Sequence, residues 1–342
     1  MTLSLVTGGS GFIGQHLVDH LILCGETVRI LDIEPPPRRQ PHVEYVQGSI
    51  TDPGSVRVAM RGVRHLYHTA AIPHLWIADP SMFHETNVVG TEIVFDQALH
   101  AGVERIVHTS SATVLVDGRS DRRATTVDES RCLEEQELIG HYARSKWRAE
   151  RVALGYADKL AVVVVMPTLP LGPGDRHFTP PSRMLLDFVN GRSLAYADCI
   201  LNIIDVRDAA KGHYLACLRG RPGQRYILNR HSLAMADFLA CLAGLTNRRM
   251  PGWKIPGSLA LAVSAGLELW SGLVSGRAPI APLAGVRASL RPIVFDGGRA
   301  QTELGLPMTA LDDTLKDAVA WLASNGHPSG EGEDPAFAFG DR

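Results

Sequence analysis

The stretch VTGGSGFIGQHL at residues 6–17 decides the fold, because it joins a β-branched run directly to an apolar helical pattern. Its glycines fit both a GxGxxG and a GxxGxxG spacing. Glycines at these positions permit a tight turn, a close approach of the backbone to a pyrophosphate, and close packing of helix on strand. The helix N-terminus then offers free N–H groups to the phosphates. The residues predicted to hold a dinucleotide here are Gly8, Gly11, Phe12, Ile13 and Gly14.

Short β-branched runs and longer helical patterns alternate through the first half of the chain, which is typical of βαβ units in a parallel sheet. Strands are expected at 3–8, 27–32, 43–48, 64–70, 105–111 and 161–167, and helices near 12–24, 53–61, 80–101 and 141–157. We therefore predict an α/β fold with a doubly wound parallel sheet of the Rossmann type, followed by a smaller C-terminal substrate-binding lobe.

The composition changes after residue 170, where PLGPGDRHFTPPS forms a Pro/Gly-rich connection. Further elements are expected at 181–190 (helix), 200–205 (strand), 206–219 (helix) and 225–228 (strand). We predict a dinucleotide-binding domain over 1–170 and a mixed lobe over 171–325 with some returns to the sheet. The Gly-, Pro- and acid-rich end over 326–342 predicts a disordered tail.

The bulk composition excludes several classes of protein. The 342 residues are 45% hydrophobic and 20% charged, with a formal net charge of −2, so nothing favours binding to nucleic acid. Five scattered cysteines form no disulfide framework or CxxC pair, which fits a reducing compartment. The N-terminus lacks the pattern of a signal peptide, so we predict a cytoplasmic protein. No metal is predicted, because His65, His68 and His74 have no acidic or Cys partner at a metal-like spacing.

Residues 256–276 form an apolar stretch that borders on the length of a membrane span. Glu268, together with several glycines, prolines and serines, favours a helix or helix pair of the lobe over a transmembrane segment. Contact with a membrane surface or with an apolar substrate is the alternative role for this stretch.

Asp32 ends the second expected strand, 18 residues beyond Gly14. A carboxylate there can accept hydrogen bonds from both adenosine ribose hydroxyls and would repel a 2′-phosphate, so we predict NAD as the cofactor. Arg38 and Arg39 follow closely and keep NADP as the alternative. A capping role for Asp32 in the turn before IEPPPRR is the other interpretation.

A serine, a tyrosine and a lysine suit acid–base chemistry at the cofactor crevice. Ser111 lies at the C-terminal end of the strand at 105–111, at the sheet edge that faces the crevice. Tyr142 and Lys146 lie four residues apart on one face of a helix. We predict that Lys146 holds the nicotinamide ribose. Together with the positive nicotinamide ring, Lys146 would lower the pKa of the Tyr142 phenol, which otherwise titrates near pH ~10. Tyr142 then exchanges a proton with a substrate oxygen that Ser111 also hydrogen-bonds. The other polar side chains of this helix are expected to face solvent: Arg144, Arg148 and Glu150.

These features, in this order, resemble an extended short-chain dehydrogenase/reductase of the NAD-dependent epimerase/dehydratase group. The resemblance covers about residues 3–325 and is strongest to the dihydroflavonol-reductase-like branch, especially the hopanoid-associated sugar epimerases of bacteria. The motifs that carry it are TGGSGFIG, HTAA (68–71), NVVGT (87–91), HTSSATV, IGHYARSK, MPTLPLGPGD (166–175), LNIIDVRDAAKGH (201–213) and FDGGRAQTELGL (295–306).

The resemblance implies further site residues. Ala70 and Ala71 would pass close to the cofactor, and Asn87 would stabilise the active-site region. The remaining implied cofactor contacts are Pro167, Thr168 and Leu169 beside the nicotinamide, and Ser49 and Ile50 near the adenine.

The chain departs from the family pattern at three points. Gly48-Ser49 stands where the family often has Gly-Asp, so the adenine contact is expected to differ. VLVDG (114–118) replaces a common Tyr-Gly, which disfavours a nucleotide sugar. Asp205 and Arg207 stand where related chains often show His and Asp, which suggests a specialised lobe.

The leading hypothesis is an oxidoreductase that transfers hydride at a secondary alcohol or ketone of a small or polycyclic, sterol-like molecule. Candidate substrate residues are His74, Trp76, Ser111, Arg176 and Phe178, although surface packing would also explain the loop positions. An epimerase or dehydratase of a sugar substrate is the close alternative, because it begins with the same three residues, and a non-catalytic dinucleotide sensor is a third. We also expect a homodimer, since the apolar stripe within 80–101 suits either the core or a dimer interface.

Overall fold

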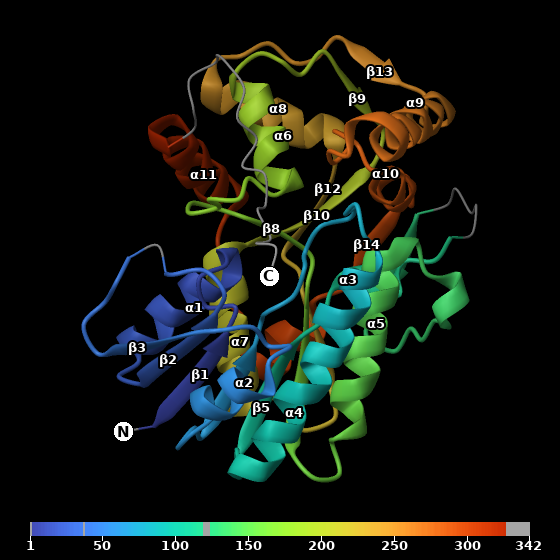
Figure 1. Ribbon diagram of the computed structural model, residues 1–342. Coiled ribbons are helices and arrows are strands. Elements are labelled where there is room, and N and C mark those ends of the chain that lie inside the picture. The colour runs from blue at the N-terminus through green and yellow to red at the C-terminus, as the bar shows by residue number, and fades with distance from the viewer. Residues whose placement is uncertain (1, 37, 119–123, 326–342) are drawn as a thin grey trace.

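The computed structural model describes residues 2–36, 38–118 and 124–325, which form a parallel sheet with helices on both faces and a smaller lobe above it (Figure 1). Within these residues the sheet has seven strands in the order β11-β7-β5-β4-β1-β2-β3, and all neighbouring pairs are parallel. The predicted doubly wound α/β fold is confirmed. The strands are β1 (Leu3–Thr7), β2 (Thr27–Asp32), β3 (Val43–Gln47), β4 (His65–His68), β5 (Arg105–Thr109), β7 (Ala161–Pro167) and β11 (Arg225–Leu228).

Alternate side chains of each strand enter two different cores. Val6 of β1 packs in one cluster with α1 (Phe12–Leu23) and α7 (Val206–Arg219). Leu5 packs in another with the helices of the opposite face, because successive side chains of a strand point to opposite faces. Those helices are α2 (Pro53–Ala59), α4 (Gly90–Ala101) and α5 (Gly140–Gly155). The strand order reverses between β1 and β4, which places a cofactor crevice at the carboxyl ends of these strands.

The helix predicted over 80–101 is divided into α3 (Ser81–His84), a π-helical turn η1 (Glu85–Val89) and α4. Its apolar stripe serves the chain's own core, since Val88 and Val94 are buried and Ile93 and Leu99 pack beside them. This stripe therefore gives no support to a dimer interface, and the homodimer stays a prediction.

The lobe is built on a small sheet, order β12-β10-β8, and three helices that share one apolar core. These elements are β8 (Leu169–Leu171), β10 (Ile200–Asp205), β12 (His231–Ala234), α6 (Pro180–Val189), α8 (Met235–Thr246) and α11 (Leu311–Asn325). Two further strand pairs join distant segments: β9 (Ala195–Ala197) with β13 (Trp253–Ile255), and β6 (Thr125–Val127) with β14 (Ile293–Phe295). Short helical turns lie at η2 (Ala112–Leu115), η3 (Glu135–Glu137) and η5 (Ala300–Leu304). Because β11 and α7 join the main sheet, the chain after residue 170 contributes to both parts.

The apolar stretch at 256–276 folds as α9 (Gly257–Trp270) and a π-helical turn η4 (Ser271–Ser275), and α10 (Leu283–Ser289) follows. Among the described residues, Gly257–Val274 is one helix that is long and apolar enough to cross a membrane by length and composition. Only 11% of it is buried within the chain. The cytoplasmic location stays a prediction, and the tail predicted over 326–342 lies outside the described residues.

Candidate active site

The backbone of the glycine turn between β1 and α1 packs so tightly that a side chain would not fit at Gly8 or Gly14. Gly8 has φ +72°, and a Cβ atom there would lie 2.7 Å from the Cα of Ala70. A Cβ atom on Gly14 would lie 2.0 Å from the Gly8 carbonyl oxygen. Gly11 is the N-cap residue of α1, and as a glycine it has no side chain that could accept hydrogen bonds from the N–H groups of the first turn. The turn therefore presents backbone N–H groups at Phe12 and Ile13, as binding of a pyrophosphate requires.

The Asp32 carboxylate lies beside this turn. It accepts hydrogen bonds from the backbone N–H groups of Ser10 (2.9 Å) and Glu34 (3.1 Å). Burial raises the pKa of Asp32, and these two bonds partly oppose the rise. Arg38 and Arg39 line a neighbouring hollow of about 570 Å³. The carboxylate predicted to bind ribose and the two cations predicted to modify its preference thus lie at the same end of the crevice.

The turn after β3 uses its polar side chains for its own structure. The Ser49 hydroxyl is 2.7 Å from the Thr51 hydroxyl and accepts from the Thr51 N–H. Asp52 caps α2 by accepting from two backbone N–H groups of its first turn. Ile50 is buried against Gly90.

Ser111 and Tyr142 meet at the carboxyl end of β5. Ser111 lies two residues beyond the end of this strand, and its hydroxyl lies close enough to the Tyr142 phenol to influence the phenol pKa. The Ser111 Oγ also accepts from the hydroxyl of Thr113 at 2.9 Å. Burial raises the pKa of Tyr142, and the neighbouring Ser111 hydroxyl partly opposes the rise. The structure thus brings together the two residues that were predicted to share one substrate oxygen.

Lys146 is buried one helical turn beyond Tyr142, and its ammonium donates a 2.6 Å hydrogen bond to the Thr109 carbonyl. Burial lowers the pKa of Lys146 to about 8, and the Glu150 carboxylate opposes this change. The lower phenol pKa of Tyr142 was predicted for Lys146 acting together with the positive nicotinamide ring, and it stays a prediction. In the protein alone, burial raises the pKa of this phenol.

Asn87 connects the loop after β4 to the helix that carries Tyr142. Its side-chain oxygen accepts from the Ile72 N–H at 2.8 Å, and its amide nitrogen donates to the Ser145 hydroxyl at 2.9 Å. Ser145 in turn donates to the Tyr142 carbonyl at 2.8 Å. Asn87 lies in the π-helical turn η1, a type of irregularity that is frequent at functional sites. Ser145 was not among the predicted site residues, because only its contact with Asn87 distinguishes it from other helix serines.

Glu150 was predicted to face solvent, and that prediction is wrong. Its carboxylate is buried, accepts a hydrogen bond from Ser110, and pairs with Arg225 at 3.1 Å. A signal was present in the sequence, because Tyr142, Lys146 and Glu150 are each four residues apart and so share one helix face.

The strand ends beside the crevice also place Pro167, Thr168 and Leu169. Pro167 ends β7 in the main sheet, and Leu169 begins β8 in the lobe. The Thr168 hydroxyl donates to the Leu228 carbonyl at 3.2 Å. Ala71 follows Ala70 in the segment next to the glycine turn. These positions therefore lie where the sheet and the lobe join.

The loop after β8 contacts the first turn of α1. The Gln15 side chain donates to the Gly174 carbonyl at 2.5 Å, and the His16 ring lies 2.8 Å from the Pro173 carbonyl. His177 from the same loop lies 3.5 Å from Glu34, near the tip of β2. We name residues 172–178 the clamp loop, because these contacts hold it over the glycine turn.

The predicted substrate residues have different surroundings. Burial lowers the pKa of His74, and the nearby charges of His177 and Asp175 act on it in opposite directions, so His74 lies beside the clamp loop. The Phe178 ring instead packs 6.2 Å from Trp321, against the lobe core. Trp76 is half-buried and Arg176 is exposed. Of these four, His74 has the best-defined place beside the crevice.

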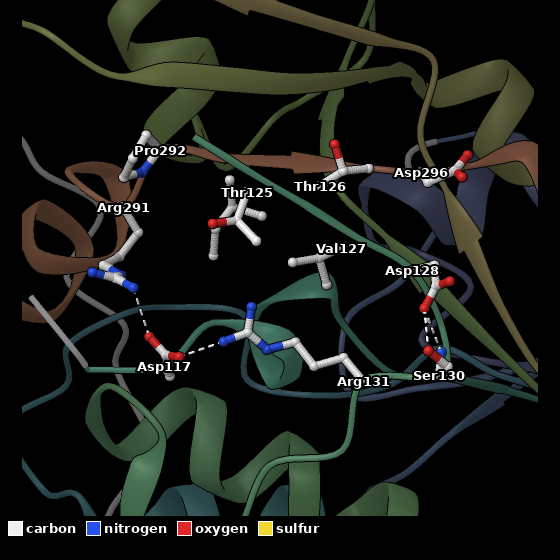
Figure 2. Close-up of a pocket in the computed structure, with 11 residues that line it drawn as sticks. Asp117, Thr125, Thr126, Val127, Asp128, Ser130, Arg131, Arg291, Pro292 and Asp296 are labelled. Atoms are coloured by element: carbon white, nitrogen blue, oxygen red, sulfur yellow. Dashed lines mark hydrogen bonds and ion pairs between the residues drawn. The ribbon is translucent and has the colours of Figure 1, made fainter. Parts of the chain in front are cut away.

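Figure 2 shows a different hollow, of about 560 Å³, between β6 and β14. Arg131 and Arg291 point to the buried carboxylate of Asp117, which pairs with both arginines. Asp117 belongs to the VLVDG segment that replaces Tyr-Gly. The structure therefore explains this departure as an anchor for two arginines. Asp205 and Arg207, another departure, likewise pair with each other at 2.7 Å where Asp205 caps α7.

The three nearby histidines occupy separate positions. His65 begins β4, and His68 lies between the hydroxyls of Thr7 (2.7 Å) and Thr91 (3.0 Å). Among the described residues, no group of three or more His, Cys, Asp or Glu side chains could hold a metal ion.

The glycine turn, the Asp32 carboxylate and the Ser111–Tyr142–Lys146 group define an enzyme of the extended short-chain dehydrogenase/reductase class. The chain belongs to the NAD dependent epimerase/dehydratase family, whose family model matches residues 4–228. The predicted family, enzyme class and NAD cofactor are thereby confirmed.

Similar proteins cover almost the whole chain. The "Putative dihydroflavonol 4-reductase" of Synechocystis sp. is 37% identical over 94% of this chain and 95% of its own. The sterol demethylase protein B of Methylococcus capsulatus is 31% identical over 94% of this chain and 99% of its own. Among solved structures, gox2253 superposes with a TM-score of 0.82 and 32% identity, covering 95% of this chain and 99% of the other.

Proposed function

We propose that this enzyme transfers hydride between NAD and a secondary alcohol or ketone of an apolar, polycyclic substrate. The observation that carries the proposal is the placement of the Ser111 hydroxyl beside the Tyr142 phenol, with the buried Lys146 one helical turn away and bonded to the Thr109 carbonyl. A phenol, a hydroxyl and an ammonium are the groups that such a reaction needs around one oxygen.

The residues divide the work as follows. NAD, when bound, supplies or accepts the hydride at the substrate carbon. In the reductive direction, Tyr142 gives its phenol proton to the carbonyl oxygen, and Ser111 donates a hydrogen bond to the same atom. Lys146 stabilises the resulting phenolate by its positive charge and holds the ribose. Glu150 keeps this charge, because its carboxylate raises the pKa of Lys146 against the effect of burial.

The surroundings of Tyr142 support an apolar substrate. The Phe83 ring lies 6.4 Å from the Tyr142 ring, and Leu75 packs against Gly285 of α10. The similar protein of Methylococcus capsulatus is named for a sterol, and a ketoreductase of Stigmatella aurantiaca, 30% identical over 97% of this chain, is named for a farnesylated dihydroquinoline oxide. Both names denote large apolar molecules.

An epimerase or dehydratase is the second candidate, and the clamp loop favours it. Bonds from Gln15 and His16 hold this loop over the glycine turn, which would slow the release of a dinucleotide. Epimerases return the hydride to the same substrate and so profit from retained cofactor. The discriminating measurement is the NAD content of the purified protein: one equivalent that survives gel filtration favours the epimerase, and free exchange favours the oxidoreductase.

The test of the proposed chemistry is Tyr142→Phe, which removes the proton donor and keeps the ring. We expect turnover of sterol ketones with NADH to fall about 10³-fold, while the Kd for NAD changes less than about threefold. The matched control is Tyr156→Phe at the end of the same helix, where the phenol hydrogen-bonds Asp96. Unchanged turnover in Tyr142→Phe would reject the catalytic role of Tyr142, whereas NAD binding without any turnover by the unchanged protein would favour a non-catalytic dinucleotide sensor.

A further inference from the structure

Helix α9 turns polar side chains towards the protein, whereas a surface helix normally turns its apolar side chains inward. Its serine at 264 is buried and donates to the Ala281 carbonyl at 2.6 Å, and the Glu268 carboxylate accepts from the Leu283 N–H at 2.7 Å. Ser271, which begins η4, is buried as well. Polar side chains at 264, 268 and 271 therefore form the inward face, because positions three and four apart share one side of a helix.

The outward face of α9 and η4 is apolar. Leu269, Trp270 and Leu273 are 64%, 61% and 76% exposed. The other large exposed apolar side chains of this region are Trp253, Leu259, Val263, Val274 and Ile280. Several large exposed apolar side chains on one helical segment are unusual for a surface in contact with water and mark an interaction site.

The segment around this face is cationic in a chain whose net charge is negative. Residues 247–290 contain Arg248, Arg249, Lys254, Arg277 and Arg287, against the single carboxylate of Glu268. Lys254 pairs with Asp198 at 2.8 Å, which leaves an excess of arginines. Apolar side chains with tryptophan, beside basic side chains, are the combination that binds the interface of an anionic bilayer.

The chain on both sides of α9 is fixed to the same body. Before α9, β13 pairs with β9 of the lobe. After it, Ala284 at the start of α10 lies against Gly140 of α5. Figure 1 shows α9 at the outer edge of the lobe, with α10 between it and the helices of the main sheet. A helix held in this way can lie on a membrane, but it cannot cross one without breaking these contacts.

We propose that the outward face of α9 and η4 docks on the surface of an anionic phospholipid bilayer. A second copy of this chain is a poorer occupant, because a symmetric pair would bring the two arginine-rich segments together. The bilayer supplies both the apolar interior and the negative charge that this face matches. The proposal concerns where the protein binds, and it stands independently of the reaction at Tyr142.

The docking face is joined to the candidate active site. The hydrogen bonds from Ser264 and Glu268 tie α9 to the segment that leads into α10. Helix α10 contacts Leu75 of the loop after β4 and Gly140, two residues before Tyr142. When the protein is docked, α10 and the loop after β4 would therefore lie close to the lipid, in which an apolar substrate dissolves.

The test is sedimentation of the full-length protein with sucrose-loaded vesicles of phosphatidylcholine and phosphatidylglycerol. Leu273→Glu adds one charge to the docking face, and Leu23→Glu adds the same charge at a leucine that is 84% exposed at the end of α1. We expect Leu273→Glu to lower the partition coefficient at least about tenfold and Leu23→Glu to change it less than about twofold. Binding should also weaken in pure phosphatidylcholine and at high salt.

Several outcomes would overturn the proposal. One is the absence of vesicle binding by the unchanged protein, and another is an equal loss in the two variants. Resistance of the bound protein to carbonate extraction would indicate insertion across the bilayer instead of docking. A dimer seen by analytical ultracentrifugation that Leu273→Glu dissociates, without vesicle binding, would assign the face to a second copy.

Discussion

Helix α5 has five charged side chains in sixteen residues, whereas α9 has one in fourteen, yet α5 buries six of its residues and α9 buries one. Composition alone would place them the other way round. Both helices bury polar side chains, but the partners differ. Lys146 and Glu150 of α5 meet a strand carbonyl, a serine and an arginine in the interior beside the crevice. Ser264 and Glu268 of α9 bond backbone groups just before and at the start of α10, and the apolar side chains of α9 stay outside. The direction of a helix's polar face, and not its overall polarity, therefore indicates what the helix does.

The same substitution in both helices should separate these two uses. Glu150→Ala leaves Arg225 and Ser110 without their buried partner, so we expect the free energy of unfolding to fall by about 3–5 kcal/mol. Glu268→Ala removes one charged hydrogen bond to a half-buried backbone N–H and should cost about 1.5 kcal/mol. Urea denaturation of the two variants measures the difference. Equal losses would mean that the buried Glu150 carboxylate contributes no more to stability than the Glu268 carboxylate of α9.

The polar interior beside α5 also predicts sensitivity to acid. Burial lowers the pKa of His68 to about 3 and of His213 to about 4, and it places the pKa of His108 well below its usual value. The unfolded chain therefore takes up these protons first, so their contribution is complete above pH ~6.5 and is lost as the pH falls towards the folded pKa values. Each histidine should cost about 2 kcal/mol at pH ~5. Residues 247–290 contain no histidine, so no histidine of the α9 region contributes to this dependence of stability on pH.

His108→Leu tests this dependence of stability on pH. Neither ring nitrogen of His108 has a hydrogen-bond partner in the described part of the chain, so the substitution breaks no hydrogen bond of the ring. We expect the variant to be at least as stable as the unchanged protein at pH ~7 and to lose about 2 kcal/mol less on going to pH ~5. Chemical denaturation at a series of pH values measures it, with the exposed His100→Leu as control. Parallel curves for His108→Leu and the unchanged protein would contradict the assignment.

The sequence predicts the parts of this molecule that depend on local pattern. Every strand of the main sheet lies within one or two residues of its expected range, because buried parallel strands are continuous apolar runs. Ser111, Tyr142 and Lys146 were found because a strand end and a helix face fix where such side chains point. The burial of Glu150 was missed, since Arg225, its partner, lies 75 residues away. The outward direction of α9 was open for the same reason: it depends on Ala281 and Leu283, and an apolar sequence alone does not state which face meets the protein.

Two leucines, one in the lobe core and one on the outward face of η4, test whether that face is exposed in solution. Leu242 of α8 is fully buried and Leu273 of η4 is 76% exposed. The same change to serine should therefore lower the free energy of unfolding strongly at Leu242 and hardly at all at Leu273. Leu242→Ser creates a cavity and buries a hydroxyl, at a cost of about 3–5 kcal/mol. Leu273→Ser should change the free energy of unfolding by less than about 0.5 kcal/mol, because the side chain at position 273 is exposed to water in the folded protein with either residue. If Leu273→Ser instead destabilised the protein in the absence of lipid by as much as Leu242→Ser, the leucine would be covered in solution. The outward face of α9 would then belong to an interface between copies, and the reversed orientation of this helix would have a structural explanation in place of a functional one.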